Sequence, residues 1–238
     1  MTGDFALWVY LSRTPLLWLT VTLMVYAVAD RIATATNRHP LANPVVVAII
    51  LMAGVLKLTG TPYATYFDGA QFVHFLLGPA TVALAIPLYE YRATVIRSLA
   101  PMLAALLVGS VVALISAVTL GTAFGIPHDV IIALVPKSVT TGVAMGIAQN
   151  LGGDPTLAAV LVMLTGMTGG ILVTPLMNLL RIQDMRARGF AAGLAAHGVG
   201  TARAFQVNEV AGAFAGIALG LNAFITAILA PLAVTFLR

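Results

Sequence analysis

The sequence predicts an all-α polytopic membrane protein with about six to eight transmembrane helices, two broken or re-entrant helical segments and an inverted repeat. Apolar residues make up 60% of the 238 residues and charged residues only 8%, whereas a soluble domain carries about 25% charge. Uncharged apolar stretches long enough to span a bilayer recur along the chain. A β-barrel would show alternating polarity in about 10-residue segments, and the sequence has none. We expect one transmembrane domain over residues 1–238.

Six stretches free of charged residues and histidine are predicted to span the membrane, because a spanning helix needs about 20 mostly apolar residues. The three long ones are residues 98–127, 155–180 and 210–237. The three shorter ones are residues 14–29, 40–56 and 75–89. Pro79 and Pro87 are expected to break the last of these, since proline interrupts helical hydrogen bonding.

Two further segments, at about residues 127–155 and 189–209, are apolar but rich in glycine and polar in the middle. Irregular backbone at membrane depth is tolerated only where protein buries it or where it lines a cavity. Clusters of arginine around residues 92–97 and 181–188 mark cytoplasmic loops. The two long spans 98–127 and 155–180 lie between these clusters and together return the chain to the cytoplasm, so the segment 127–155 must enter and leave on the outer face. By the same argument, the segment 189–209 forms a hairpin from the cytoplasm.

The two segments also align weakly with each other at an offset of 60 residues. Lys137 then pairs with His197, Thr141 with Thr201, and Thr81 occupies the same register once more. Discontinuous helices in an inverted repeat are typical of secondary-transporter binding sites.

The first candidate site follows Pro136, which is expected to end one helix, with Ser and Thr capping the next. A half-helix beginning there would direct free N–H groups at one point, and a lysine would add a full charge. Such a site suits a small carboxylate; the alternative is that the lysine snorkels to the outer interface. The candidate substrate-binding residues are Lys137, Ser138, Thr140 and Thr141.

The second candidate group is His197, Thr201 and Arg203. Histidine can carry a proton near neutral pH, and arginine can bind a carboxylate with two hydrogen bonds. The alternative is that Arg203 is an interfacial charge and His197 packs in a polar helix seam. Asn208 and Glu209 are possible partners of Arg203.

Several classes of protein are excluded or disfavoured. Metalloprotease, P-loop, dinucleotide-binding and hydrolase motifs are absent, so we expect no enzyme, no cofactor and no metal. The chain has no cysteine, which rules out disulfides and cysteine-based metal sites. The net charge of +4 follows the positive-inside pattern rather than indicating nucleic acid. Glycines spaced by four, including Gly166/Gly170 and Gly212/Gly216, predict close helix packing.

Three blocks, LLGPATVALAIPLY, VPKSVTTGVAMGIAQNLGGDP and AAHGVGTARAFQVNE, occur in this order and resemble the LrgB/CidB family of antiholin-like and YohK-type bacterial membrane proteins. The resemblance covers roughly residues 43–231. It implies a multi-pass protein of the bacterial inner membrane, usually paired with an LrgA/CidA-type membrane subunit, and we also expect a homo-oligomer. Two activities are implied: transport of small carboxylates such as glycolate, glycerate and pyruvate, or holin-like control of murein hydrolase export and lysis.

Three hypotheses remain open at the level of the sequence. The first is a secondary transporter for a small monocarboxylate, which fits the broken segments and their polar residues. The second is a holin-like or antiholin-like protein that acts through oligomeric pores. The third is a regulatory subunit that is active only with its LrgA-like partner.

Overall fold

The computed structural model describes residues 15–76, 79, 82–83 and 85–235, and all regular structure in this part of the chain is helical. Four of its helices are long and apolar enough to cross a membrane. They are α2 (Pro15–Ala35), α8 (Leu99–Ala123), α11 (Pro155–Leu179) and α13 (Glu209–Thr235). The prediction of a polytopic helical membrane protein is therefore confirmed.

The structure describes the predicted span 75–89 only in part. Helix α4 (Tyr63–Phe75) ends where this predicted span begins, and α6 (Ala85–Glu90) covers its last part. Residues 77–78, 80–81 and 84 lie outside the described residues, so the aligned Thr81 does too, and the predicted break at Pro79 and Pro87 stays a prediction.

The chain divides into two compact units, Met1–Ala85 and Ile86–Arg238, and each is described by itself. In the first unit, α2 packs against α4 and against α3 (Pro44–Thr59). The buried Trp18 ring meets the edge of Tyr66 at a centroid distance of 6.0 Å. Asn43 caps α3 through its side chain, and Gly60 ends that helix in the left-handed conformation.

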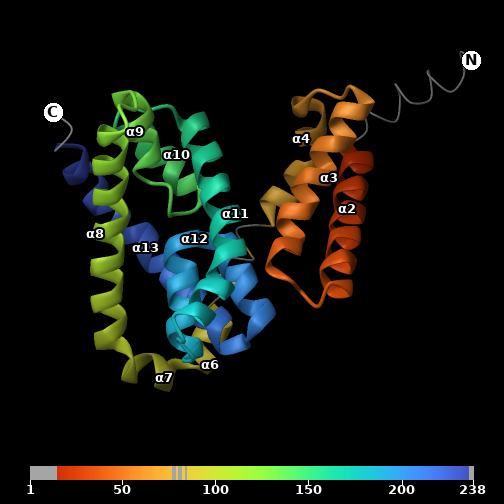
Figure 1. Cartoon of the computed structure of the whole chain (residues 1–238). Coiled ribbons are helices and arrows are strands. Elements are labelled where there is room, and N and C mark those ends of the chain that lie inside the picture. Colours follow the sequence, from red (N-terminus) through yellow and green to blue (C-terminus); the bar gives the residue numbers. More distant parts are fainter. Residues whose placement is uncertain (1–14, 77–78, 80–81, 84, 236–238) are drawn as a thin grey trace, which may run out of the picture. The chain divides into compact units, whose positions relative to one another are not determined.

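The second unit contains α7 (Arg92–Arg97), α8, α9 (His128–Leu134), α10 (Thr141–Asn150), α11, α12 (Met185–Val207) and α13. Helices α9 and α10 form a first hairpin beside one end of α8 (Figure 1). Gly153, just after α10, lies against Ile132 near the end of α9. Figure 1 shows α11 beginning at the end of the unit where α8 ends, so the chain enters along α9, turns, and returns along α10 to the end where it started. Pro136 falls in the turn, as predicted from its inability to continue a helix.

Helix α12 is a second hairpin, because its backbone leaves the helical conformation at Ala196 and His197. Gly200 approaches the carbonyl oxygen of Ala192 so closely that a β-carbon would not fit, which shows that the chain folds back on itself. Beyond the break, the chain returns to the end from which α12 began. The first half of α12 then runs beside α13 in the same direction, with Gly189 on Ala211 and Gly193 on Ala215.

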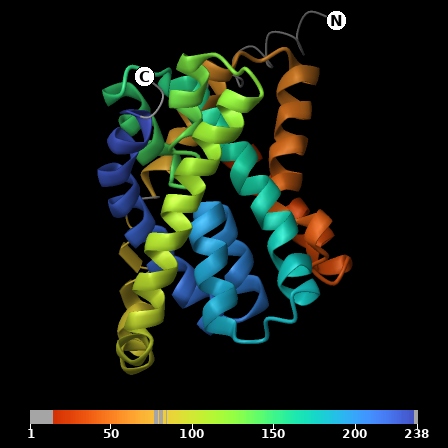
Figure 2. The same cartoon turned by 60° about the vertical axis from the view of Figure 1, so that its left-hand side comes forward.

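The two hairpins enter the second unit from opposite ends, as the arginine pattern predicts (Figures 1 and 2). The Arg186 guanidinium donates to the Ser98 hydroxyl at 3.2 Å, so the arginine cluster at 181–188 and the one before α8 share one end. The positive-inside rule predicts that this charged end is the cytoplasmic one. The hairpin α9–α10 enters from the other end, and α12 enters from the charged end.

The predicted close packing of small residues is confirmed at two glycines. Gly166 on α11 faces the ring of His197, and Gly212 on α13 faces the ring of Phe205. Gly220 has open space around it. The closest approaches between helices occur instead at Gly189 and Gly193, which the spacing argument did not include.

Candidate functional site at the hairpin tips

The turning points of the two hairpins meet at the side chain of Asn222 on α13. We call residues 135–140 the first tip and Ala196–His197 the second tip. The Asn222 amide nitrogen donates to the backbone oxygen of Ser138 in the first tip at 3.1 Å. It also donates to the backbone oxygen of Leu194, two residues before the second tip, at 3.0 Å. One side chain thus bridges both hairpins.

The acceptor side of the same amide completes this cluster. The hydroxyl of Ser110 on α8 donates to the Asn222 side-chain oxygen at 2.9 Å, and that of Thr226 does so at 3.1 Å. Ser110, Asn222 and Thr226 are each 1% exposed. A buried amide that satisfies both its donor and its acceptor groups fixes the position of every element it touches.

The meeting point lies deep in the helical unit. Asn222 is 13 residues from either end of α13, which places it about 20 Å from each end at 1.5 Å per residue. Ser110 occupies the middle of α8 in the same way. Since a bilayer core is about 30 Å thick, the tips meet near the middle of the membrane.

The first tip carries the polar residues predicted from the sequence. Ser138 is buried, and Lys137, Thr140 and Thr141 are half-buried. The Lys137 amine donates to the backbone oxygen of Ala113 on α8 at 3.1 Å. Thr140 occupies the N-cap position of α10, but its side chain makes no capping hydrogen bond. The prediction that a Ser or Thr side chain caps α10 is therefore wrong, although Thr140 occupies the capping position. The N–H groups of the first turn of α10 receive no hydrogen bond from this side chain.

The second tip is built around His197, which is buried and has φ +41° and ψ −133°. This backbone conformation is strained for a residue with a side chain, and such strain concentrates at functional sites. A ring nitrogen, Nε2, lies 3.0 Å from the backbone oxygen of Val162 on α11. The Thr201 hydroxyl donates to the His197 backbone oxygen at 2.9 Å. His197 therefore lies in the second tip, and Thr201 lies one helical turn after it.

Arg203 is placed elsewhere. Its Nε donates to the Thr174 hydroxyl at 3.3 Å, and its Nη1 donates to the Gln206 side chain at 3.3 Å. Thr174 lies twelve residues beyond Val162, the partner of His197, on α11. At 1.5 Å per residue that is about 18 Å along the helix. The structure thus separates Arg203 from the hairpin tips.

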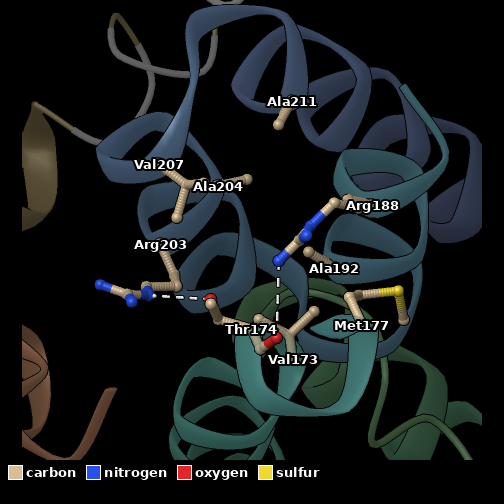
Figure 3. A pocket seen from close by; sticks show the side chains of 9 residues that line it. All are labelled: Val173, Thr174, Met177, Arg188, Ala192, Arg203, Ala204, Val207 and Ala211. Carbon is tan, nitrogen blue, oxygen red and sulfur yellow. Dashed lines mark hydrogen bonds between the residues drawn. The ribbon is translucent and has the colours of Figure 1, made fainter. Parts of the chain in front are cut away.

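Arg203 instead lines a small pocket of about 20 Å³ near the end that carries the arginine cluster. Figure 3 shows this pocket, with the side chains of Arg203 and Arg188 meeting Thr174 through different atoms. Arg188 donates to the Asn178 side chain at 2.8 Å and to the Ile182 backbone oxygen at 3.3 Å. Arg188 thereby satisfies polar groups at the end of α11. Room for about one water molecule is too little for a carboxylate.

The predicted partners of Arg203 have other roles. The Asn208 side-chain oxygen accepts from the backbone N–H groups of Val210 and Ala211, so Asn208 caps α13. Glu209 is the exposed first residue of α13, where a negative charge favours the helix dipole.

Metal binding finds no support in the described residues, where no three His, Asp or Glu side chains lie together as ligands. Asn222, Ser110 and Thr226 are site residues that the sequence analysis missed. The available signal was a single asparagine in the uncharged, apolar stretch 210–237. Burying an amide deep in a span costs free energy unless it has hydrogen-bond partners.

The fold and the tips define a helical membrane protein with two re-entrant hairpins that meet at mid-depth. The chain belongs to the LrgB-like family, whose family model matches residues 22–236. It is 37% identical over 195 residues to the uncharacterised protein YxaC of Bacillus subtilis, covering 82% of this chain and 85% of YxaC. It is 33% identical to YwbG of the same organism, covering 92% and 97% of the two chains.

A third relative is the holin-like protein CidB of Staphylococcus epidermidis, which is 32% identical and aligned over 90% of this chain and 93% of CidB. The resemblance to the LrgB/CidB family stated from the sequence blocks is thereby confirmed. No solved structure matches the chain.

Proposed function

We propose that this protein is a secondary transporter of a small monocarboxylate of the glycolate, glycerate or pyruvate class. The observation that carries the proposal is the meeting of two hairpin tips, which enter from opposite ends, at Asn222 in the middle of α13. Secondary transporters bind their substrates at such places, where discontinuous helices face each other near the bilayer midplane.

Anion binding at the tips follows from the residues of the first tip. Lys137 supplies a positive charge, and the hydroxyls of Thr140 and Thr141 stand at the start of α10. The first turn of α10 adds the positive end of a helix dipole. A carboxylate needs a charge and a few donors of this kind. We assign substrate binding to Lys137, Ser138, Thr140 and Thr141, with His197 and Thr201 on the facing hairpin.

Alternating access requires the site to open to one side at a time. The first hairpin reaches the site from one end of the unit and the second hairpin from the other. Movement of either hairpin away from Asn222 would open a path on its own side. The single amide that holds both tips gives this movement a common pivot.

The cell context of the proposal follows from the family. We place the protein in the bacterial inner membrane as a multi-pass protein, working with an LrgA/CidA-type subunit and as a homo-oligomer.

A second candidate function is holin-like control of lysis through oligomeric pores, or of murein hydrolase export. The name of the relative CidB, a holin-like protein, favours it. A pore conducts without saturation and tolerates large solutes, whereas a transporter saturates and retains them.

The test is flux in proteoliposomes made with the full chain, with and without an LrgA-type partner. Labelled pyruvate and glycolate are followed together with a bulky trapped dye. We expect saturable carboxylate uptake, retention of the dye, and loss of uptake in Lys137→Met. Dye release with non-saturating flux would overturn the transporter and favour the pore.

A further inference from the structure

We propose that Lys137 carries the coupling proton, so that one proton and one carboxylate cross the membrane together through the same side chain. This inference rests on the proposed function and names its driving ion. Lys137 follows Pro136 in the first tip, at the depth where the two hairpins meet. Its amine donates to the Ala113 backbone oxygen near the middle of α8.

The setting of Lys137 contains no compensating negative charge among the described residues. The ion pairs in that part of the chain join Arg38 to Asp30 and Arg186 to Asp184, and neither involves Lys137. The partner of its amine is a backbone oxygen of a helix. A charged amine in an apolar interior is costly unless an anion accompanies it.

The titratable groups around Lys137 are few. Helices α8, α10 and α11 have no charged residue or histidine, and Asp154 caps the start of α11. Helix α13 has Glu209 at its first residue, 13 residues from Asn222. Helix α9 has His128 and Asp129 at its outer end. Helix α12 contributes His197 at its tip, and its arginines lie toward the other end.

His197 is poorly placed to be the proton carrier. Its Nε2 already faces the Val162 backbone oxygen, and its ring is packed against Gly166. A backbone oxygen accepts but never donates, so this contact holds Nε2 protonated as the donor and leaves only Nδ1, on a ring fixed by packing, to take up a further proton. The Lys137 nitrogen has two N–H groups and a lone pair as a neutral amine and three N–H groups as an ammonium, and the Ala113 oxygen accepts from one of them.

The transport cycle then balances without a further ion. On the side of higher acidity, the neutral amine of Lys137 takes one proton from water and becomes an ammonium. The ammonium binds the carboxylate, and the neutral pair crosses the site as the hairpins exchange access. On the other side the carboxylate leaves and the ammonium returns its proton to water. One proton and one negative charge move together, so the cycle transfers no net charge.

Uptake of labelled pyruvate by proteoliposomes of the full chain, with its partner subunit if uptake requires it, tests the proposal. A gradient of one pH unit should give about tenfold accumulation, since an electroneutral one-to-one cycle equalises the two gradients. A potassium diffusion potential or a sodium gradient should give none. Protein-free vesicles set the background from passive permeation of the uncharged acid.

Lys137→Arg separates binding from coupling, because arginine keeps a positive charge and does not release its proton. We expect exchange of labelled for unlabelled pyruvate at equal pH to persist and accumulation driven by the pH gradient to disappear. The matched control is Lys57→Arg, which makes the same change at the other lysine of the chain, exposed on α3. This control should accumulate pyruvate like the parent protein.

A second measurement covers the case in which Lys137→Arg fails to fold. In the Lys57→Arg protein, Lys137 is the one remaining lysine, and an amine-reactive label located by mass spectrometry reports on it. Saturating pyruvate should suppress its labelling at least tenfold. Unchanged labelling would overturn the assignment to Lys137.

The outcomes distinguish this inference from the proposed function. Saturable pyruvate uptake that follows the sodium gradient or the potential, and ignores the pH gradient, overturns proton coupling and leaves the transporter standing. If Lys137→Arg accumulates pyruvate at the parent level, another group carries the coupling proton, which also overturns the inference. Absence of saturable carboxylate flux from the parent protein overturns the transporter, and the inference with it.

Discussion

The side-chain amide of Asn222 donates to the backbone oxygen of Ser138 at 3.1 Å, and through this bond α13 holds the first hairpin tip at the middle of the unit. The same nitrogen reaches Leu194, next to the second tip. Backbone oxygens at a turn have no helical partner. Asn222 therefore satisfies groups that the two broken helices leave open, which is why an asparagine is found deep in a spanning helix.

Asn222→Ala should destabilise the protein by about 1–3 kcal/mol, because it leaves buried backbone and hydroxyl groups without partners. Thermal unfolding in detergent measures the change. Asn150→Ala, at the exposed end of α10, is the matched control and should behave like the parent protein. Equal unfolding temperatures for the two variants would show that Asn222 does not hold the tips.

Much of this architecture could be predicted from sequence because a bilayer imposes simple requirements. Long uncharged stretches located α8, α11 and α13, and the arginine clusters decided the end from which each hairpin enters. Glycine-rich, polar stretches marked the two broken segments. The alignment of Lys137 with His197 paired residues that the structure places at the two turning points.

The contacts between helices could not be predicted in the same way. Asn222 and Ser110 lie 112 residues apart, and no local pattern joins them. Arg203 follows the second tip closely in sequence, yet the chain runs back along the second half of α12 and carries it toward Thr174. Gly189 and Gly193 share the spacing of four that predicts close packing, but the spacing does not identify their neighbours Ala211 and Ala215 on another helix.

Gly193→Ala should destabilise the fold by about 1–3 kcal/mol, since a β-carbon would collide with the backbone oxygen of Ala215 and force α12 away from α13. Gly220→Ala, on α13, meets open space and should be neutral or stabilising by up to about 1 kcal/mol, because alanine favours a helix. Unfolding temperatures of the two variants test the pair. A neutral Gly193→Ala would mean that α12 does not pack this closely.

Gly166→Ala should reduce saturable carboxylate uptake at least tenfold, because its β-carbon would press on the ring of His197 and displace the second tip. Gly146→Ala on α10 is the control, since nothing lies within 4 Å of the added carbon. Uptake is normalised to the amount of reconstituted protein. Parent-level uptake by Gly166→Ala would separate His197 from the transport site.

Asp184 gives a prediction about pH. Hydrogen bonds from the Arg186 guanidinium, with the closest contact at 2.6 Å, lower the pKa of Asp184, which also caps α12. A lowered pKa in the folded state stabilises the fold above the unfolded pKa of about 3.9. This contribution is lost as the pH falls through the folded pKa.

Asp184→Asn keeps a capping side chain and removes the charge. The parent protein should unfold at a slightly higher temperature than this variant near neutral pH. The difference should shrink below about pH 4 and vanish once the pH is below the lowered pKa of Asp184 in the folded protein. The effect is small because exposed ion pairs contribute little. A difference that persists unchanged in acid would assign it to another interaction.

Lys137 and Arg203 offer the last comparison, since the sequence placed both in the substrate site and the structure separates them. Lys137→Gln should raise the KM for carboxylate uptake by about tenfold or more, because a charge-assisted hydrogen bond contributes about 1.5–3 kcal/mol. Arg203→Gln should leave the KM within about twofold and lower the unfolding temperature, since Arg203 joins α12 to Thr174 on α11. A KM raised equally by Arg203→Gln would place the carboxylate in the pocket of Thr174 rather than at the hairpin tips.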